Sequence, residues 1–423
     1  MKTIMQLRNQ VKYLELILVT GILAFVYLSN ISKVEFHPDE SQWIGTSAAF
    51  ESYLRMEFRS QTWDVSYWTL TQPPVTRYII GLGRYIGGYR RPDLNRPWNF
   101  ERGREFNERV GAVPSIDLLW WSRLPMAILG ILSIGLGFLI LRKSAGAIAA
   151  YAWLGLAAIN PYFSLHLRRA MGESSLVFFT ILTLYLATQA LDSAKQINTT
   201  QKRNVTLWLL LAGITSGLAW ASKLNGILVL GTNLAIAALL GSMRNERLKG
   251  KITRGIWYGL ITSALCLFTF LAVNPFLWPS PIERTLMMFK NRTLEMNQQT
   301  ITHSGSYMDL GQRFKIIPTR VFQDYASLPI PAVFNFILVA LGVFITLLSI
   351  WGLLTRQNFK PAYVTFPIMA FFTASPIWFS QLDWDRYYIF PVLFATAFTA
   401  IAIDWIIHTS LHIGKKFFSQ PSG

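Results

Sequence analysis

The chain has 423 residues, of which 52% are hydrophobic and only 14% are charged, and its formal net charge is +17 at pH 7. This composition is too apolar for a soluble globule and is typical of a protein with many membrane spans. The positive charge does not indicate a nucleic-acid partner, because much of it lies in short loops where topology and anionic headgroups explain it. The single cysteine, Cys266, excludes an intrachain disulfide and a cysteine-based metal site.

Ten apolar runs are long enough to cross a bilayer of about 30 Å. They cover residues 14–31, 118–141, 145–162, 174–191, 205–221, 224–241, 256–278, 333–354, 362–379 and 388–407. We therefore predict an all-α polytopic membrane protein of about ten transmembrane helices, a single domain over residues 1–423 with no C-terminal soluble domain. The first run lacks a small-residue cleavage site, so we interpret it as a retained anchor.

Lys and Arg collect in loops on one side of this topology, which predicts cytoplasmic termini. Two long loops, at about 32–117 and 279–332, then lie on the outer side, and we expect them to carry short amphipathic helices. In the first loop, one such helix on the bilayer surface is indicated by the helical spacing of Trp43, Phe50, Leu54 and Phe58. The absence of sorting signals favours a bacterial plasma membrane.

Two adjacent carboxylates follow the first apolar run in the sequence His37-Pro38-Asp39-Glu40. Charges beside hydrocarbon are costly, so those at the mouth of a membrane protein usually face a polar cavity or take part in chemistry. Asp39 also has a simpler interpretation as the cap of a helix that begins near Ser41, with Gln42 close to the capping-box position. A cap needs no second carboxylate, and we therefore favour a catalytic role.

Three further segments place charged residues at the outer ends of predicted spans. They are Arg168-Arg169-Ala170-Met171-Gly172-Glu173, Gly217-Leu218-Ala219-Trp220-Ala221-Ser222-Lys223, and Asp385-Arg386-Tyr387-Tyr388 with Pro391. The first outer loop also contains the block Gln72-Pro73-Pro74-Val75-Thr76-Arg77, whose two prolines should end any helix before it.

Together with the Asp-Glu pair, these motifs resemble the protein O-mannosyltransferases and their bacterial relatives, including the aminoarabinose transferases of lipid A, all in the GT-C glycosyltransferase superfamily. The resemblance covers roughly residues 10–405. It implies a GT-C-like bundle of transmembrane helices, with the Asp-Glu motif in the first outer loop and a sugar donor carried on polyprenyl phosphate. This sequence departs from the family pattern at Gln72, where His or Lys is usual, and in lacking the soluble domain of several members.

The resemblance implies a membrane glycosyltransferase that moves a monosaccharide, mannose-like or another hexose or pentose, from polyprenyl phosphate to an acceptor hydroxyl at the outer face. Such a transfer needs a base for the acceptor proton and cations for the departing phosphate. We assign the base to Asp39, with Glu40 orienting it or binding hydroxyls; a single displacement then inverts the anomeric carbon. The expected partners are the lipid-linked donor, a protein, lipid or glycan acceptor, and membrane lipids.

Phosphate binding is assigned to Lys223, Arg168 and Arg169, because arginine offers a fork and lysine a point charge; snorkelling towards headgroups is the alternative. By the resemblance, Glu173 is a third catalytic carboxylate, and an i,i+4 ion pair with Arg169 is its alternative. Arg386 is expected to bind phosphate or sugar, with a local salt bridge to a neighbouring aspartate as the alternative.

Substrate contacts are further assigned to Gln72, Arg77 and His303. We expect no required cofactor: His37, His303 and several carboxylates could bind a divalent metal, but no His-x-x-x-His or comparable spacing supports such a site. The rival hypothesis is a transporter or lipid flippase without bond chemistry. Ionisable residues at mid-span or an inverted repeat would favour that alternative, and the sequence shows neither.

Overall fold

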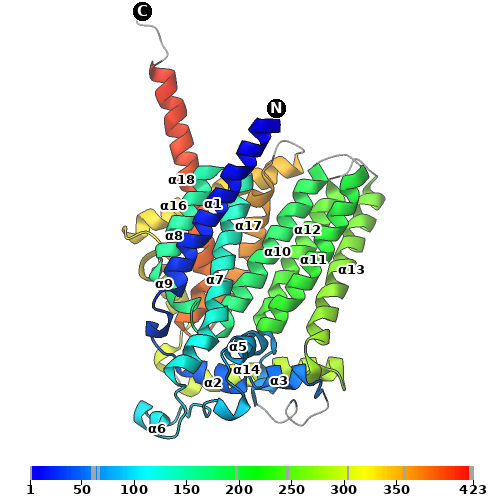
Figure 1. The fold of residues 1–423 in the computed structure, drawn as a ribbon. Helices are drawn as coiled ribbons and strands as arrows, with labels where there is room; N and C mark the ends of the chain where they lie inside the picture. Colours follow the sequence, from blue (N-terminus) through cyan, green and yellow to red (C-terminus); the bar gives the residue numbers. More distant parts are fainter. Residues whose placement is uncertain are drawn as a thin grey trace, which may run out of the picture.

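The computed structural model describes residues 2–58, 63, 67–195, 199–243, 247–302, 304–355 and 359–418. This part of the chain is helical throughout, apart from turns and one isolated bridge between Tyr307 and Leu382. Long helices run side by side as a bundle, and short helices cover one end of it (Figure 1). The all-α fold predicted from the sequence is confirmed.

Eight helices among the described residues are long and apolar enough to cross a membrane. Five of them are α7 (Ile116–Ser144), α10 (Gly172–Lys195), α11 (Thr199–Ser222), α13 (Leu248–Ala272) and α16 (Ala332–Leu354). The other three consist of α12 (Leu228–Ser242), α17 (Pro361–Ala374) and α18 (Ile389–Phe418) with adjoining 3-10 turns, and cover Leu224–Ser242, Pro361–Phe379 and Asp385–Ile413. The two remaining predicted spans coincide with shorter apolar helices, the 13–28 part of α1 (Lys2–Leu28) and α8 (Ala147–Ile159). The chain is thus a multi-pass membrane protein, as predicted.

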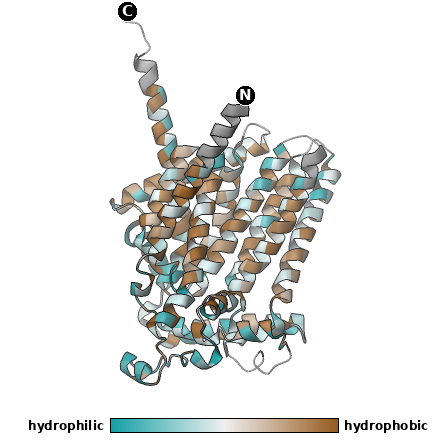
Figure 2. Cartoon of the chain, in the orientation of Figure 1, coloured by the Kyte–Doolittle hydropathy of each residue, from teal (hydrophilic) through white to brown (hydrophobic). Residues whose placement is uncertain are grey.

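The bundle is held together by apolar side chains that the spanning helices turn towards one another. Figure 2 shows these helices to be predominantly hydrophobic, and the largest buried cluster joins α1, α7, α8, α10, α17 and α18. Helix backbones also approach closely: a Cβ added at Gly342 of α16 would lie 2.0 Å from the carbonyl oxygen of Phe398 in α18. Small residues permit such contacts where lipid provides no hydrophobic drive for association.

The short helices gather at one end of the bundle, which we call the loop end (Figure 1). Between α1 and α7 the chain forms α2 (Pro38–Thr46), α3 (Ala49–Leu54), α4 (Tyr67–Thr71), α5 (Val75–Ile86) and α6 (Arg104–Arg109). Between α13 and α16 it forms α14 (Pro281–Thr302) and α15 (Leu310–Thr319). A further short helix, α9 (Pro161–His166), directly follows α8. These helices bring residues of both long loops to the same end.

The single surface helix expected over Trp43 to Phe58 is wrong. The structure divides this stretch into α2 and α3, and Trp43 is buried in a cluster with Ile44 and Ile80 rather than facing the bilayer. The predicted helix break at Pro73-Pro74 is confirmed, because α4 ends at Thr71 and α5 begins at Val75. The surface helix was wrongly expected because helical spacing alone does not distinguish a lipid-facing surface from a protein-facing one.

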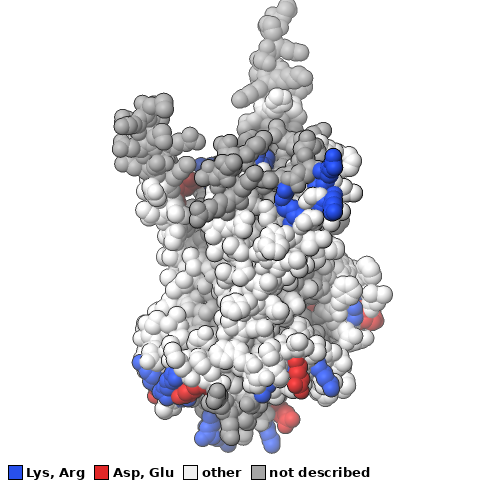
Figure 3. Space-filling model, turned by 90° about the vertical axis from the view of Figure 1, so that its right-hand side faces the viewer, with Lys and Arg blue, Asp and Glu red and all other residues white. Residues whose placement is uncertain are grey.

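The chain ends lie opposite the loop end, because α1 begins and α18 ends at the same end of the bundle (Figure 1). The cytoplasmic location of both termini stays a prediction. Figure 3 shows a group of Lys and Arg side chains at the upper end of one face and both signs of charge at the lower end. Helix α13 begins at the upper end with the basic segment Leu248-Lys249-Gly250-Lys251.

Candidate active site

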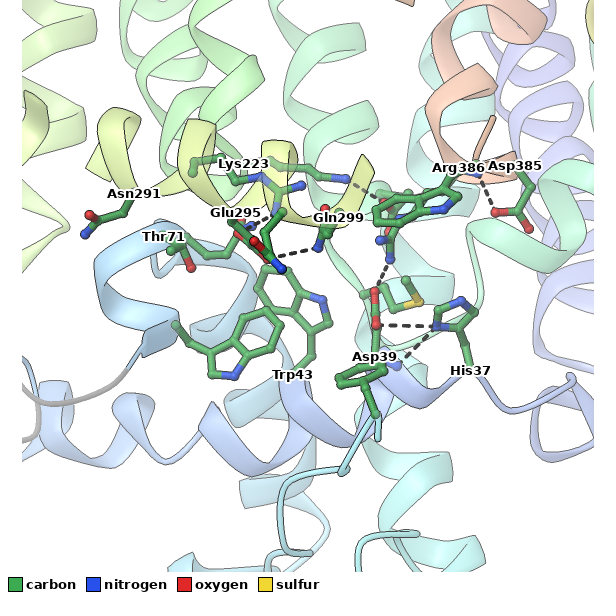
Figure 4. Close-up of a pocket in the computed structure, with 18 of the residues that line it drawn as sticks. His37, Asp39, Trp43, Thr71, Lys223, Asn291, Glu295, Gln299, Asp385 and Arg386 are labelled. Carbon is green, nitrogen blue, oxygen red and sulfur yellow. Dashed lines mark hydrogen bonds and ion pairs between the residues drawn. The ribbon is translucent and has the colours of Figure 1, made fainter. Parts of the chain in front are cut away.

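A cavity of 1350 Å³ opens at the loop end, between α2, α4, α10, α14 and the segment that precedes α18 (Figure 4). Among the described residues, its charged lining consists of six carboxylates and four cations: Asp39, Glu101, Glu173, Glu295, Asp383 and Asp385, with Lys223, Arg292, Arg320 and Arg386. Each of the four cations forms an ion pair with one of these carboxylates. The cavity therefore holds paired charges rather than an open cationic patch.

Asp39 and Arg386 meet at one side of the cavity, although α2 and the turn before α18 are far apart in sequence. The Oδ2 atom of Asp39 accepts a hydrogen bond from Nη1 of Arg386, and both side chains are largely buried (Figure 4). Burial acts to raise the pKa of Asp39, but the charge of the Arg386 guanidinium outweighs it and holds the pKa below its usual value. Asp39 is therefore ionised at neutral pH.

His37 fixes the first turn of α2. Its Nδ1 accepts a hydrogen bond from the Asp39 backbone N–H at 3.1 Å, and its own N–H donates to Oε2 of Glu40 at 3.0 Å. His37 is thus the N-cap, in a capping box with Glu40, and the interpretation of Asp39 as the cap is wrong. Burial lowers the pKa of His37. The neutral ring then carries its proton on Nε2, as a hydrogen-bond donor at the cavity wall.

A second ion pair lies in the same cavity, between Glu173 at the start of α10 and Lys223 just after α11. Lys223 Nζ lies 2.7 Å from Glu173 Oε1, and Glu173 is almost fully buried. The first turn of a helix favours a carboxylate, because the backbone N–H groups there carry partial positive charge. Burial acts to lower the pKa of Lys223, and the nearby Glu173 carboxylate only partly offsets this. The alternative pairing of Glu173 with Arg169 is wrong.

The chain turn after α11 holds Lys223 in place. Gly226 lies so close to α11 that an added Cβ would be 2.1 Å from the carbonyl oxygen of Ala219. Thr76 of α5 bonds to the Ser175 hydroxyl at 2.7 Å and donates to the Ser222 carbonyl oxygen at 3.0 Å. The helix α5 thereby links the chain beside Glu173 to the chain beside Lys223.

Glu40 has a different environment from its neighbour Asp39 and does not line the cavity. Its side chain is fully buried, and its Oε2 accepts a hydrogen bond from Arg123 of α7 at 2.6 Å. The other oxygen accepts the Ala170 backbone N–H at 2.8 Å. Arg123 also donates to the carbonyl oxygens of Ile31 and Val34. Glu40 joins α2 to α7 and to the turn before α10.

The two adjacent arginines before α10 also lie outside the cavity lining. Arg168 donates to the carbonyl oxygens of Ser164 and Ser29, so it ties α9 to the end of α1. Arg169 is buried and lies 3.5 Å from the exposed carboxylate of Glu35. The structure therefore brings Asp39, Glu173, Lys223 and Arg386 together but leaves these two cations at the periphery.

The predicted substrate contacts separate in a similar way. Gln72 lines the cavity, whereas the buried Arg77 donates to the Gln72 carbonyl oxygen at 2.7 Å and supports the wall from behind. His303 lies outside the described residues. Among the described residues, no cluster of three or more His, Cys, Asp or Glu side chains is arranged to hold a metal ion.

Sequence reasoning missed the wall formed by α14. Arg292 pairs with Glu295 at 2.6 Å, and Gln299 donates to Glu295 at 3.2 Å, so one polar stripe of this helix lines the cavity (Figure 4). The signal was available, because Asn291, Glu295 and Gln299 recur every four residues and so share one helix face.

Three further cavity residues, Arg320, Asp383 and Asp385, were also missed. Arg320 pairs with Asp383 at 2.6 Å, and the Tyr388 hydroxyl lies 2.7 Å from the same carboxylate. Asp385 faces the buried His166 at 3.5 Å, and burial lowers the pKa of that histidine to about 4. Pairs of this kind join distant segments and leave no pattern in the sequence.

Comparison with known proteins identifies the family. The model of the dolichyl-phosphate-mannose-protein mannosyltransferase family matches residues 43–279, more than half of the chain. The chain belongs to this family. Mouse protein O-mannosyl-transferase 1 is 32% identical over 171 residues, which are 40% of this chain and 21% of the mouse protein. The predicted membership in the GT-C glycosyltransferases is confirmed.

Solved structures show the same fold at low sequence identity. ArnT from Cupriavidus metallidurans bound to undecaprenyl phosphate superposes with a TM-score of 0.52 at 18% identity, covering 92% of this chain and 59% of that one. The oligosaccharyltransferase of Archaeoglobus fulgidus tethered with an acceptor peptide gives 0.54 at 14% identity, covering 95% and 50%. This chain thus spans about half the length of the structures it resembles.

Proposed function

We propose that this chain is a glycosyltransferase that moves a monosaccharide from a polyprenyl-phosphate carrier to an acceptor hydroxyl, with Asp39 as the general base. The observation that carries this proposal is the Asp39 carboxylate in a cavity whose lining also carries the cations Arg386 and Lys223. A base for the acceptor proton and cations for the leaving phosphate are the two requirements of the reaction. Membership in the mannosyltransferase family supports the same reaction over transport.

The ion pairs suggest an order of events. Among the described residues, the cavity lining carries six carboxylates and four cations, and every cation is paired, so the donor phosphate is bound only where a cation turns to it from its carboxylate. The donor phosphate draws Arg386 from Asp39 and Lys223 from Glu173, because a phosphate oxygen accepts strong hydrogen bonds from both. Donor binding therefore releases the carboxylate that acts as the base.

The chemical step is then a single displacement. Asp39 takes the proton of the acceptor hydroxyl while that oxygen attacks the anomeric carbon. The bond between this carbon and the phosphate oxygen breaks, and the electron pair leaves with the lipid phosphate, which Arg386 and Lys223 stabilise. Attack from the face opposite the leaving group inverts the anomeric carbon.

The donor class is supported by ligands of structures with the same fold, undecaprenyl phosphate in ArnT and dolichol phosphate in the archaeal oligosaccharyltransferase AglB. Mannose is the sugar that the family description suggests. We place the loop end on the outer side of the membrane and the termini in the cytoplasm, following the distribution of Lys and Arg.

Transfer of radiolabelled mannose from polyprenyl-phosphate-mannose to extracted membrane acceptors tests the proposal. The Asp39→Asn variant should transfer about 10²- to 10⁴-fold more slowly than the wild type, the range expected for loss of a general base. Arg142, whose ion pair with Glu15 is outside the cavity, provides the control variant Arg142→Gln. Equal transfer by wild type and Asp39→Asn would assign the base elsewhere, and no transfer by the wild type would exclude this donor.

A further inference from the structure

The helix α14 has an unusual distribution of polar and apolar side chains. Its polar stripe faces the cavity through Arg292, Glu295 and Gln299. Its other side is exposed and includes the large apolar residues Ile282, Leu286 and Ile301, none of which lines the cavity. Met288 anchors the helix in a buried cluster. A surface helix normally turns its polar side to water, so the inward polar stripe needs an explanation within the cavity.

The wall near this stripe is aromatic. Trp43 of α2 and Trp68 of α4 both line the cavity, with ring centroids 6.1 Å apart. The Asn291 amide of α14 lies 3.5 Å from the carbonyl oxygen of Leu70 in α4, so α14 and the aromatic wall are directly connected. This side of the cavity is distinct from the side where His37, Asp39, Asp385 and Arg386 lie (Figure 4).

Gln299 carries an unused hydrogen-bonding atom. Its Nε2 donates to Glu295, but its Oε1 is buried and accepts no hydrogen bond from any residue that the structure describes. A buried amide oxygen without a donor is costly, so such atoms usually have a ligand or water as partner. A hydroxyl group bound in the cavity would supply the missing donor.

We propose that α14 and the tryptophan wall form a subsite for a pyranose ring, with Gln299 and Glu295 binding its hydroxyls. An amide and a carboxylate match the hydroxyl groups of a sugar, and a flat aromatic wall matches its apolar C–H faces. The subsite rests on the proposed glycosyl transfer and specifies it further. The pyranose belongs either to the lipid-linked donor or to a sugar on the acceptor.

Binding of two lipids by the purified full chain tests the subsite. Affinities for undecaprenyl phosphate and undecaprenyl-phosphate-mannose are compared in the wild type, in Gln299→Leu and in the control Asn297→Leu. Asn297 is exposed, lies two residues away on the same helix and does not line the cavity. The lipid preference is the ratio of the affinity for undecaprenyl-phosphate-mannose to that for undecaprenyl phosphate. If the subsite binds the donor sugar, Gln299→Leu should lower this ratio about five- to tenfold and leave the affinity for undecaprenyl phosphate unchanged.

The acceptor is examined in the same variants. For an acceptor subsite, the lipid preference stays as in the wild type, whereas the KM for a glycan-bearing acceptor rises and that for an unglycosylated acceptor does not. Glu295→Gln replaces Gln299→Leu if the latter does not fold. If the wild type binds the donor, and Gln299→Leu changes neither the lipid preference nor the KM for the glycan-bearing acceptor, the subsite alone is overturned. A wild type that binds neither lipid would overturn the proposed function and the subsite with it.

Discussion

Asp39 and Glu40 are adjacent in sequence and both bind an arginine from a distant helix, but the two pairs have different surroundings. The Glu40–Arg123 pair is fully buried, and both members bond to the backbone: Glu40 accepts the Ala170 N–H and Arg123 donates to the Val34 carbonyl oxygen. The Asp39–Arg386 pair lines the cavity and keeps 15% and 16% of its side chains exposed. One pair is enclosed by protein and the other adjoins space that a ligand can fill. The degree of burial, and not the residue type, therefore distinguishes the structural pair from the pair that can contact a substrate.

The largest expected effect is a loss of stability on breaking the enclosed pair, Glu40 and Arg123. Glu40→Gln leaves the Arg123 charge buried without its carboxylate, which should lower the free energy of unfolding by about 3–5 kcal/mol. Asp39→Asn should lower transfer and destabilise the protein less than Glu40→Gln does, because the Arg386 charge that it leaves unpaired adjoins a cavity that water can fill. Thermal unfolding of both variants in detergent measures the difference.

The double variant Glu40→Gln with Arg123→Met sharpens this comparison. Removing both charges of a buried pair is often nearly neutral, so the double variant should regain most of the stability lost by Glu40→Gln. Equal loss of stability in Asp39→Asn and Glu40→Gln would contradict the division into an enclosed pair and a cavity pair.

The next largest effect is expected for Arg386→Gln. In this variant the leaving phosphate loses a charged donor, and transfer should fall by about 10²- to 10³-fold, the cost of removing a preorganised donor at a developing charge. The bare lipid phosphate should also bind more weakly. Initial rates at varied donor concentration measure both effects, and Arg320→Gln, which removes the separate pair with Asp383, is the matched control. Loss of transfer in both variants to the same degree would argue against a specific role for Arg386.

The spans could be predicted from the sequence because hydropathy is a local property. The four residues that meet in the cavity, Asp39, Glu173, Lys223 and Arg386, were also found, because charges at span ends are rare enough to be noticed. Their partners were not predictable: Asp39 and Arg386 are separated by 347 positions, and no local pattern relates them.

The position of Glu40 outside the cavity does not support its assignment to catalysis. Here too, the partner of the carboxylate lies far away in the sequence. Its partner Arg123 lies in the apolar stretch of α7 and is fully buried. A lone arginine within an apolar run was a signal that a carboxylate must be nearby, since an unpaired charge there is costly. The α14 wall was missed because a polar stripe on an amphipathic helix does not itself show whether it faces water or a cavity, and only the fold turns that stripe inward.

The smallest expected effect is on the pH dependence of transfer. It tests whether the ion pair of Asp39 and Arg386 opens during the reaction. In the free protein Arg386 holds the pKa of Asp39 below its usual value, so the base stays ionised as pH falls and is lost only on passing that lowered pKa. The stability that the pair contributes follows the same sign: it is present above the unfolded-state pKa of Asp39 and is lost as pH falls through the folded-state value. In the donor complex Arg386 binds the phosphate, and the pKa of Asp39 should rise.

Because kcat/KM reports the free enzyme and kcat reports the complex, the acid limb of kcat/KM for the donor should lie at lower pH than the acid limb of kcat, by about one unit. Arg386→Gln removes the cation from the free enzyme, so the two limbs should move together. Coincident limbs in the wild type would mean that Arg386 stays on Asp39 throughout, and that the phosphate is held by other cations of the cavity. The pH profile thus distinguishes a pair that opens for the donor from one that is as permanent as Glu40 and Arg123.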